Sequence, residues 1–460
     1  MTSGCILPKN GCMAQTVDPF SIGDFGDKRL NAVGRRIFKR VCEGFTACIK
    51  SLAGNRALEV SFGRFLGNKR VNVETISAEL AKKTNDTCRG KKHVLCIQDT
   101  VQLTYPKQDI KKRNFGPTGD SGTKGLFMHP SVIVDAETRD VMGASNIVTW
   151  IRSGESSEKK QKRCIEEKES IRWIDSAVRS KEAIANAAMI TIVGDRESDI
   201  FEVYERVPDE RTHIIVRASH DRDLTCGEKI SERLESAPIA GIHEIELERI
   251  SGVRKKRTAS LEIKHVTVKF EKDGEPIELN CVSAVEMSEV PEGESRISWV
   301  LLTTHEVNTL EDAIQILIWY TWRWIIEQIF RTMKNKGMKI EDSQIETPKK
   351  LMVMAAMGFA ASIKAMSLVE SRDGKSNRPA SDLFSDEELV LLALICLKVQ
   401  GKTEKQKNSY PEGTLSWAAW VIARLGGWNG YSSESPPGPI TMLKGLQKFE
   451  LQYEGWKLAQ

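Results

Sequence analysis

Residues Tyr320–Lys334 read YTWRWIIEQIFRTMK and combine charged residues and apolar residues at helical spacing. As an α-helix turning about 100° per residue, the stretch puts a phenol, a carboxylate and three cations in a stripe about 80° wide: Tyr320, Arg323, Glu327, Arg331 and Lys334. The other side carries apolar residues expected to pack on a core: Trp322, Ile325, Ile329 and Met333. A single acid among bases suits a metal ion beside a polyanion and favours phosphodiester chemistry. The simpler alternative is a surface helix with an Arg323–Glu327 ion pair.

Two more carboxylates follow short apolar runs. The run VLCI at 94–97 leads into Gln98, Asp99 and Thr100, and the run MITIV at 189–193 leads into Gly194 and Asp195. Such runs predict buried strands, and open α/β sheets bind ligands at the carboxyl ends of their strands. Either aspartate alone could be a helix N-cap or a turn residue. Together with Glu327 they make a set of three carboxylates.

These blocks resemble a known family. The pattern Y-x-x-R-x-x-x-E-x-x-x-x-x-x-K, formed by Tyr320, Arg323, Glu327 and Lys334, resembles the signature around the third catalytic acid of the insertion-sequence-four (IS-four) family of bacterial DDE transposases. QDT at Asp99 and DRESDI at Asp195 resemble the blocks that carry the first and second acids, in the same order. The resemblance runs in scattered blocks from about residue 23 to residue 456 and points to the Tn-five-like grouping within the family.

The resemblance implies an α/β fold with an RNase H-like catalytic core, a mixed sheet flanked by helices. Asp99, Asp195 and Glu327 would be the catalytic residues and would hold two Mg²⁺ ions, with Mn²⁺ able to substitute. Phosphoryl transfer depends mainly on positioning and charge neutralisation, which such a site supplies. Tyr320, Arg323 and Lys334 would grip phosphates beside the scissile bond, together with Arg331.

Two further DNA-binding residues come from the resemblance. Trp299, in SWVLLTT, matches a tryptophan that stacks near a flipped base, although composition alone favours a core aromatic. Arg217, in IIVRAS, matches a DNA-contacting arginine. The implied reaction is cut-and-paste transposition: nicking, hairpin formation, hairpin opening and strand transfer. The partners would be transposon ends, target DNA and a second copy of the chain, with no small-molecule substrate and no membrane. An RNase H-like nuclease without strand transfer and a non-cutting end-binding regulator are the alternatives.

The first 73 residues predict a helical DNA-end-binding domain. Amphipathic patterns cover 27–41 and 56–66, and three arginines share one face of the first: Arg29, Arg36 and Arg40. A solvated basic face would give the same composition. The texts GDKRLNAVGRR and FGRFLGN resemble the N-terminal domain of the family.

Residues 74–369 are expected to form the catalytic domain. Asp195 and Glu327 lie 327 − 195 = 132 residues apart, and much of the interval predicts strands, so we expect a β-rich insertion at about 222–305. Its run RKKR at 254–257 is a candidate phosphate contact or a solvated hairpin tip. The Gly- and Lys-rich loop 106–125 lacks the ending of a phosphate-binding P-loop and is interpreted as a connector that touches DNA.

Residues 370–460 predict a helical C-terminal domain for dimerisation. Ser385 and Glu388 form the pattern of a capping box ahead of an apolar helix. The last helix carries an apolar seam that favours self-association: Leu446, Phe449, Tyr453 and Trp456. The texts RLGGW and EGW resemble the dimerisation region of the family.

Composition limits the remaining possibilities. The chain of 460 residues has a net charge of +4, which permits a nucleic-acid partner without requiring one. Its ten cysteines form no C-x-x-C pair, which favours reduced thiols in a cytosol and gives no zinc pattern. The longest apolar run, residues 389–397, is too short to span a membrane, and the N-terminus lacks a signal-peptide pattern. The expected location is the bacterial cytoplasm, on nucleoid DNA.

Overall fold

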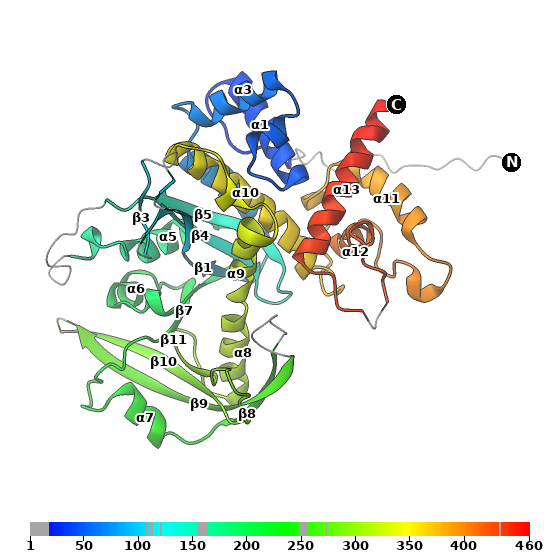
Figure 1. Ribbon diagram of the computed structural model, residues 1–460. Coiled ribbons are helices and arrows are strands. Elements are labelled where there is room, and N and C mark those ends of the chain that lie inside the picture. Colours follow the sequence, from blue (N-terminus) through cyan, green and yellow to red (C-terminus); the bar gives the residue numbers. More distant parts are fainter. Residues whose placement is uncertain are drawn as a thin grey trace.

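A computed structural model gives the fold (Figure 1). It describes residues 18–106, 108–109, 114–119, 122–153, 164–247, 256–272, 274–431 and 434–460, without the side chains of 335 and 336. The chain forms one large mixed sheet flanked by helices, which confirms the predicted α/β architecture. Its division into three domains stays a prediction.

Among the described residues, the sheet holds eleven strands. Nine of them follow the order β2-β4-β1-β6-β7-β11-β10-β9-β8, while β3 and β5 both pair with β4. The pairs β1–β6 and β6–β7 are parallel, and the other pairs are antiparallel. The strands are β1 His93–Gln98, β2 Val101–Pro106, β3 Gly116–Pro117, β4 Thr123–Asp135, β5 Val141–Trp150, β6 Met189–Gly194, β7 Thr212–Arg217, β8 Gly241–Leu247, β9 Arg257–Lys272, β10 Glu275–Glu286 and β11 Ser298–Thr303.

The two predicted apolar strands lie in the middle of this sheet, as β1 and β6. Their side chains alternate between two cores. Leu95 and Ile97 of β1 face the core that contains the long helix α10 (Pro348–Glu370), whereas Val94 and Cys96 face the core beneath α5 (Ile171–Ala183). Burial on both faces explains why these strands read as continuous apolar runs.

The predicted β-rich insertion extends the same sheet rather than forming a separate one. Its strand β11 pairs with the core strand β7 in antiparallel register, Leu301 opposite Arg217. The remaining insertion strands β10, β9 and β8 follow outward in that order. Figure 1 shows them at the end of the molecule away from α1 and α3. Residues 248–255 of this insertion lie outside the described residues.

The helices before and after the sheet pack around α10. Contacts join α10 to α1, α3, α4, α9, α12 and α13. Figure 1 shows α10 crossing the centre of the molecule. The α-helices not yet given are α1 Lys28–Gly44, α2 Ile49–Ala53, α3 Arg56–Gly67, α4 Val73–Thr87, α6 Phe201–Arg206, α7 Ile230–Ser236, α8 Leu310–Thr321, α9 Trp324–Arg331, α11 Asp386–Val399, α12 Leu415–Leu425 and α13 Pro439–Leu458. The predicted capping box is confirmed at the start of α11.

Helix α10 is largely apolar. By length and composition it could cross a membrane, with a mean hydropathy of 1.7, but 89% of that window is buried inside the protein. Burial on every side by the sheet and the terminal helices explains this composition.

The seam predicted for self-association is not available on the surface. Leu446, Phe449 and Tyr453 are at most 5% exposed, because α13 packs on α1, α10 and α12 of its own chain. Tyr453 also donates a hydrogen bond to Glu387, at 2.6 Å. The interpretation of this seam as a dimer contact is therefore wrong: the apolar periodicity reflects intramolecular packing.

Candidate active site

Asp99 and Asp195 occupy equivalent positions, each directly after the end of one of two neighbouring parallel strands, β1 and β6. Ile97 of β1 is paired with Val193 of β6, an offset of 193 − 97 = 96, and the aspartates have the same offset, 195 − 99 = 96. Each stands two residues beyond a side chain that faces the α10 core, Ile97 or Val193. Because side chains alternate along a strand, both aspartates are directed to that side. Adjacent strands lie about 4.8 Å apart, which brings the two carboxylates together.

The Asp99 carboxylate is held from two directions. Its Oδ1 accepts a hydrogen bond from the Thr100 backbone N–H at 2.7 Å, and its Oδ2 accepts one from Arg323 at 2.9 Å. The side chain is 15% exposed. Burial raises the pKa of Asp99 to about 7 against the opposing attraction of Arg323, and the negative charges of Asp195 and Glu327 raise it further. The site therefore carries surplus negative charge.

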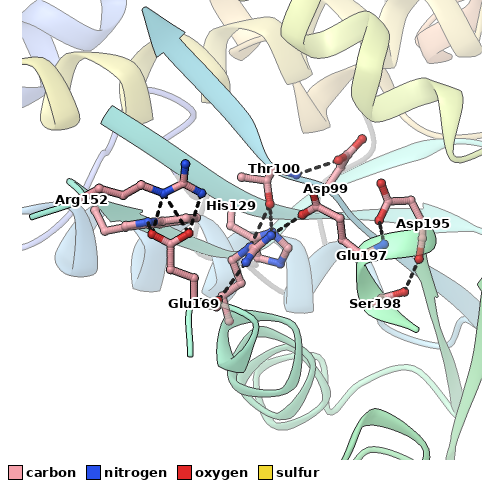
Figure 2. Close-up of polar contacts among 10 residues, drawn as sticks. Asp99, Thr100, His129, Arg152, Glu169, Asp195, Glu197 and Ser198 are labelled. Carbon is pink, nitrogen blue, oxygen red and sulfur yellow. Dashed lines mark hydrogen bonds and ion pairs between the residues drawn. The ribbon is translucent and has the colours of Figure 1, made fainter. Parts of the chain in front are cut away.

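Asp195 is both a candidate ligand and a local cap. Its Oδ1 accepts a hydrogen bond from the Glu197 backbone N–H at 2.8 Å, which caps the short 3₁₀ helix Arg196–Ser198. The Ser198 hydroxyl donates to the Asp195 carbonyl at 2.6 Å (Figure 2). The capping role considered for a lone aspartate is thus real, and it orients the carboxylate beside Asp99.

Glu327 reaches the site from a helix that is interrupted. The single helix predicted over 320–334 is wrong in detail: α8 ends at Thr321, residues Trp322 and Arg323 form a tight turn, and α9 begins at Trp324. A π-helical turn follows at Thr332–Lys336. The turn arises because the Trp322 and Arg323 N–H groups bond three residues back, to Trp319 and Tyr320. The apolar face still packs as expected, with Ile325, Ile329 and Met333 fully buried.

Arg323 joins Glu327 to Asp99. Its Nη2 lies 2.5 Å from Glu327 Oε1, and its Nη1 lies 2.9 Å from Asp99 Oδ2. The i,i+4 ion pair considered as the simpler alternative is present, but the same guanidinium also spans to β1, and its side chain is only 11% exposed. Sequence-distant carboxylates are therefore bridged by one cation.

The donor set suits a hard divalent cation. Carboxylate oxygens are the ligands that Mg²⁺ and Mn²⁺ accept, and burial, with the nearby charges of Asp195 and Glu327, raises the pKa of Asp99, so a bound cation would favour its ionised form. Within the described part of the chain, the only set of three or more His, Cys, Asp or Glu residues whose ligand atoms all lie within 4.8 Å of one another is Glu43, Glu450 and Glu454, where α1 meets α13, so Asp99, Asp195 and Glu327 are spread more widely than that. A metal at Asp99 and Glu327 would therefore take over positions that the Arg323 guanidinium now holds.

The remaining residues of the 320–334 stripe face different neighbours. Tyr320 is 4% exposed, and its ring lies edge-on to Trp299 at 5.7 Å. Lys334 donates to the Gln102 carbonyl at 2.9 Å and pairs with Glu341 at 3.1 Å. Arg331 is exposed. Of the three, only Arg331 is free of a packing or pairing role among the contacts described.

Trp299 is largely enclosed. It is 6% exposed, between Tyr320 and Trp324, whose ring centroid lies 6.4 Å away. Trp324 is 38% exposed, so the open aromatic surface of this cluster belongs to a residue that the sequence did not single out, although it lies inside the signature. Arg217 lies close by on β7 and donates to the Ser298 carbonyl at 3.1 Å.

Of the other basic residues predicted to contact DNA, some are exposed and others are held in ion pairs. On α1, Arg29 and Arg36 are exposed, while Arg40 pairs with Glu454 of α13 at 3.0 Å. In the run at 254–257, the first two residues lie outside the described residues and Lys256 pairs with Glu246 at 2.9 Å. Arg257 is 14% exposed in ion pairs with Glu286 and Glu294. Its interpretation as a phosphate contact is wrong, because buried carboxylates already hold its charge.

The absence of a side chain at Gly194 allows Ser198 of the Asp195 turn to pack against the end of β6. An added Cβ would lie 2.2 Å from Ser198 Oγ and 2.7 Å from Ser198 Cβ. Gly194→Ala is expected to lower the free energy of unfolding by about 1–3 kcal/mol through overpacking, measured by thermal or urea unfolding. Gly63→Ala is the control, since no atom lies within 4 Å of its Cβ position on α3. Equal stability of the two variants would contradict this account.

The chain matches a family model over the same region. The model is described as a transposase DDE domain and covers residues 90–363, more than half of the chain and all three carboxylates. Among solved structures, the chain is similar to a piggyBac transposase synaptic complex with hairpin DNA, at 8% identity and a TM-score of 0.33, covering 82% of this chain and 56% of that one. On the family match, the chain belongs to the transposase DDE domain family.

Proposed function

We propose that this protein catalyses cut-and-paste DNA transposition, with Asp99, Asp195 and Glu327 as its catalytic residues. The family is one of enzymes that cleave and join DNA. The observation that carries the assignment is the equivalent placement of Asp99 and Asp195 at the carboxyl ends of the parallel strands β1 and β6, with Glu327 linked to Asp99 through Arg323. Phosphoryl transfer needs such convergent charge more than it needs a covalent catalyst.

We infer an RNase H-like core within the larger sheet. The supporting observation is the strand order β5–β4–β1–β6–β7, in which three antiparallel strands are followed by two strands parallel to β1. In this proposal residues 74–369 form the catalytic domain with its insertion at about 222–305, residues 1–73 bind the transposon end, and residues 370–460 form the dimerisation domain. The finer relationship proposed is to the IS-four family.

DDE transposase domains are generally dependent on divalent metal ions. We propose that Asp99, Asp195 and Glu327 hold two Mg²⁺ ions, with Mn²⁺ able to substitute; when bound, they activate the attacking oxygen and stabilise the leaving one. Arg323, displaced from the carboxylates, would then contact the phosphate beside the scissile bond, which suits its bidentate geometry. Lys334, Arg331 and Tyr320 are proposed to line the same DNA strand.

The proposed partners are double-stranded DNA and a second copy of the chain. Arg29 and Arg36 are exposed on α1 and are proposed to contact the transposon end. A homodimer in the synaptic complex and a place on bacterial nucleoid DNA complete the proposal. Nuclease activity without joining and end binding without cutting remain the competing functions.

The deciding experiment uses DNA flanking the gene, with its terminal inverted repeats, as labelled substrate. Protein is added with Mg²⁺, and the products are run on a denaturing gel. Transposition predicts nicked and then hairpinned ends, followed by joining of the 3′ end to a second DNA. Cleavage without joining identifies the nuclease, and binding without cleavage identifies the regulator.

Hairpin formation is expected to depend on Trp324 as well as Trp299. Extruding a base requires an aromatic face to receive it, worth about 1–3 kcal/mol. We expect Trp324→Ala to nick at the normal rate but to form hairpins about tenfold more slowly, measured by the gel assay. Trp299→Ala should lose hairpins too and, being 6% exposed, should also lower stability by about 3–5 kcal/mol. Normal hairpin yields in Trp324→Ala would remove this role.

A further inference from the structure

Arg172 lies between the two loops that carry Asp99 and Asp195. It stands in the first turn of α5, and its side chain is 12% exposed. The guanidinium lies 5.5 Å from the ring centroids of both Trp150 and Trp173, and its Nη1 donates to the Glu169 carbonyl at 2.9 Å. These contacts fix the plane of the guanidinium from its own side of the site.

The other two contacts of Arg172 reach one residue beside each aspartate. Its Nε donates to Thr100 Oγ1 at 3.0 Å, and its Nη2 is paired with the Glu197 carboxylate. Thr100 and Glu197 are the two residues whose backbone N–H groups donate to the catalytic carboxylates, to Asp99 at 2.7 Å and to Asp195 at 2.8 Å. Figure 2 shows Thr100 beside Asp99 and Glu197 beside Asp195. One side chain thus holds both residues that orient the two aspartates.

Thr100 is held from behind as well. Arginine can only donate, so the Thr100 hydroxyl accepts from Arg172 and has its proton free for His129 Nδ1, 2.9 Å away. His129 is fully buried, edge-on to Trp173, and burial keeps its pKa well below the usual range, so its ring remains neutral. The position of Thr100 is therefore determined by two fixed partners.

We propose that Arg172 is a positioning residue that fixes the spacing between Asp99 and Asp195 and so sets the affinity of the site for its divalent ions. This inference rests on the proposed function of the two aspartates. Partners of metal ligands commonly change metal affinity by about 10–100-fold when they are removed. The Glu197 side chain is 63% exposed, and an ion pair this exposed contributes little to folding stability. The role of the Arg172–Glu197 pair is therefore to position the Asp195 turn.

The test compares metal affinity and cleavage in matched variants. Mn²⁺ binding to metal-stripped protein is measured by calorimetry, and nicking of labelled end DNA is followed against Mg²⁺ concentration. We expect R172Q to bind Mn²⁺ at least about tenfold more weakly and to need correspondingly more Mg²⁺, with normal end binding. E197Q should shift both in the same direction, and R172Q/E197Q should be no worse than R172Q, because both changes break one linkage.

R152Q is the control. Arg152 is another arginine near the site, paired with Glu169 at 2.6 Å and stacked on Phe127, with no contact to either aspartate loop among those described. It should leave Mn²⁺ affinity unchanged. Wild-type affinity in R172Q, or an equal loss in R152Q, overturns the proposal. If R172Q does not fold, E197Q decides, since its site is exposed.

The outcomes separate this inference from the proposed function. Nicking by the wild type with unchanged affinity in R172Q overturns only the role of Arg172. Mn²⁺ binding without nicking by the wild type overturns the function, and the role of Arg172 is then decided by the affinities alone. A wild-type protein that neither binds Mn²⁺ nor nicks DNA overturns both.

Discussion

Glu327→Ala is expected to abolish DNA cleavage, lowering the nicking rate by about three orders of magnitude or more. Glu327 is the one acid within α9, and it pairs with the Arg323 guanidinium that also binds Asp99. Asp99→Ala and Asp195→Ala should have the same effect, because each removes one of the three anionic groups proposed to hold the cations. The measurement is single-turnover nicking of labelled end DNA in saturating Mg²⁺.

End binding should survive these changes, since the exposed arginines of α1 lie on another helix. A gel-shift titration checks this, and Glu311→Ala supplies a matched loss of charge at an exposed site on α8. Glu311→Ala should cut normally. Retained cleavage in any of the three carboxylate variants would refute the assignment, whereas loss of end binding would mean that the variant had damaged the fold.

In the absence of metal, Asp99→Asn is expected to stabilise the protein above pH 7. Burial raises the pKa of Asp99 to about 7, so the folded protein holds this proton more tightly than the unfolded chain, in which the ordinary value is 3.8. The stability that this proton contributes is complete below about pH 4 and is lost as the pH rises to about 7. Asparagine cannot ionise, so the variant should gain on the order of 2–4 kcal/mol at pH 8 and little at pH 4.

Unfolding temperatures measured in chelator from pH 4 to 8 check this expectation. Asp175→Asn is the control, because Asp175 is exposed on α5. Adding Mg²⁺ should then stabilise the wild type and reduce the advantage of Asp99→Asn, since a bound cation supplies the charge that the empty carboxylates lack. If the unfolding temperatures of Asp99→Asn and the wild type changed with pH in parallel, the raised pKa of Asp99 would be contradicted.

Local pattern was enough to predict the two buried strands that precede Asp99 and Asp195. The apolar runs before Asp99 and Asp195 leave few alternatives to buried parallel strands, because both faces of β1 and β6 are covered. Periodicity could not tell what covers an apolar face. The seam of α13 has the same spacing whether a second chain or α1, α10 and α12 packs on it.

The partners of single charges were also beyond the sequence. The sequence around Arg257 does not predict its ion pairs with Glu286 and Glu294, because those contacts depend on strand register. Arg172 carries no motif, and its role emerges only when Thr100 and Glu197 are brought to it from β1 and β6. The break between α8 and α9 was not predicted either. Trp322 and Arg323 keep nearly helical backbone angles there, so no helix-breaking residue is needed to make the turn.

The shared core around α10 has a consequence for synthesis on the ribosome. Phe62 and Phe65 of α3 belong to the same hydrophobic core as Leu351 and Phe359 of α10, about 300 residues later in the chain. At about 5–20 residues per second, the N-terminal helices wait roughly 15–60 s for that partner to be translated. Throughout this interval the nascent chain exposes apolar surface that chaperones recognise. We therefore expect the N-terminal helices to reach their native packing only after α10 has been translated.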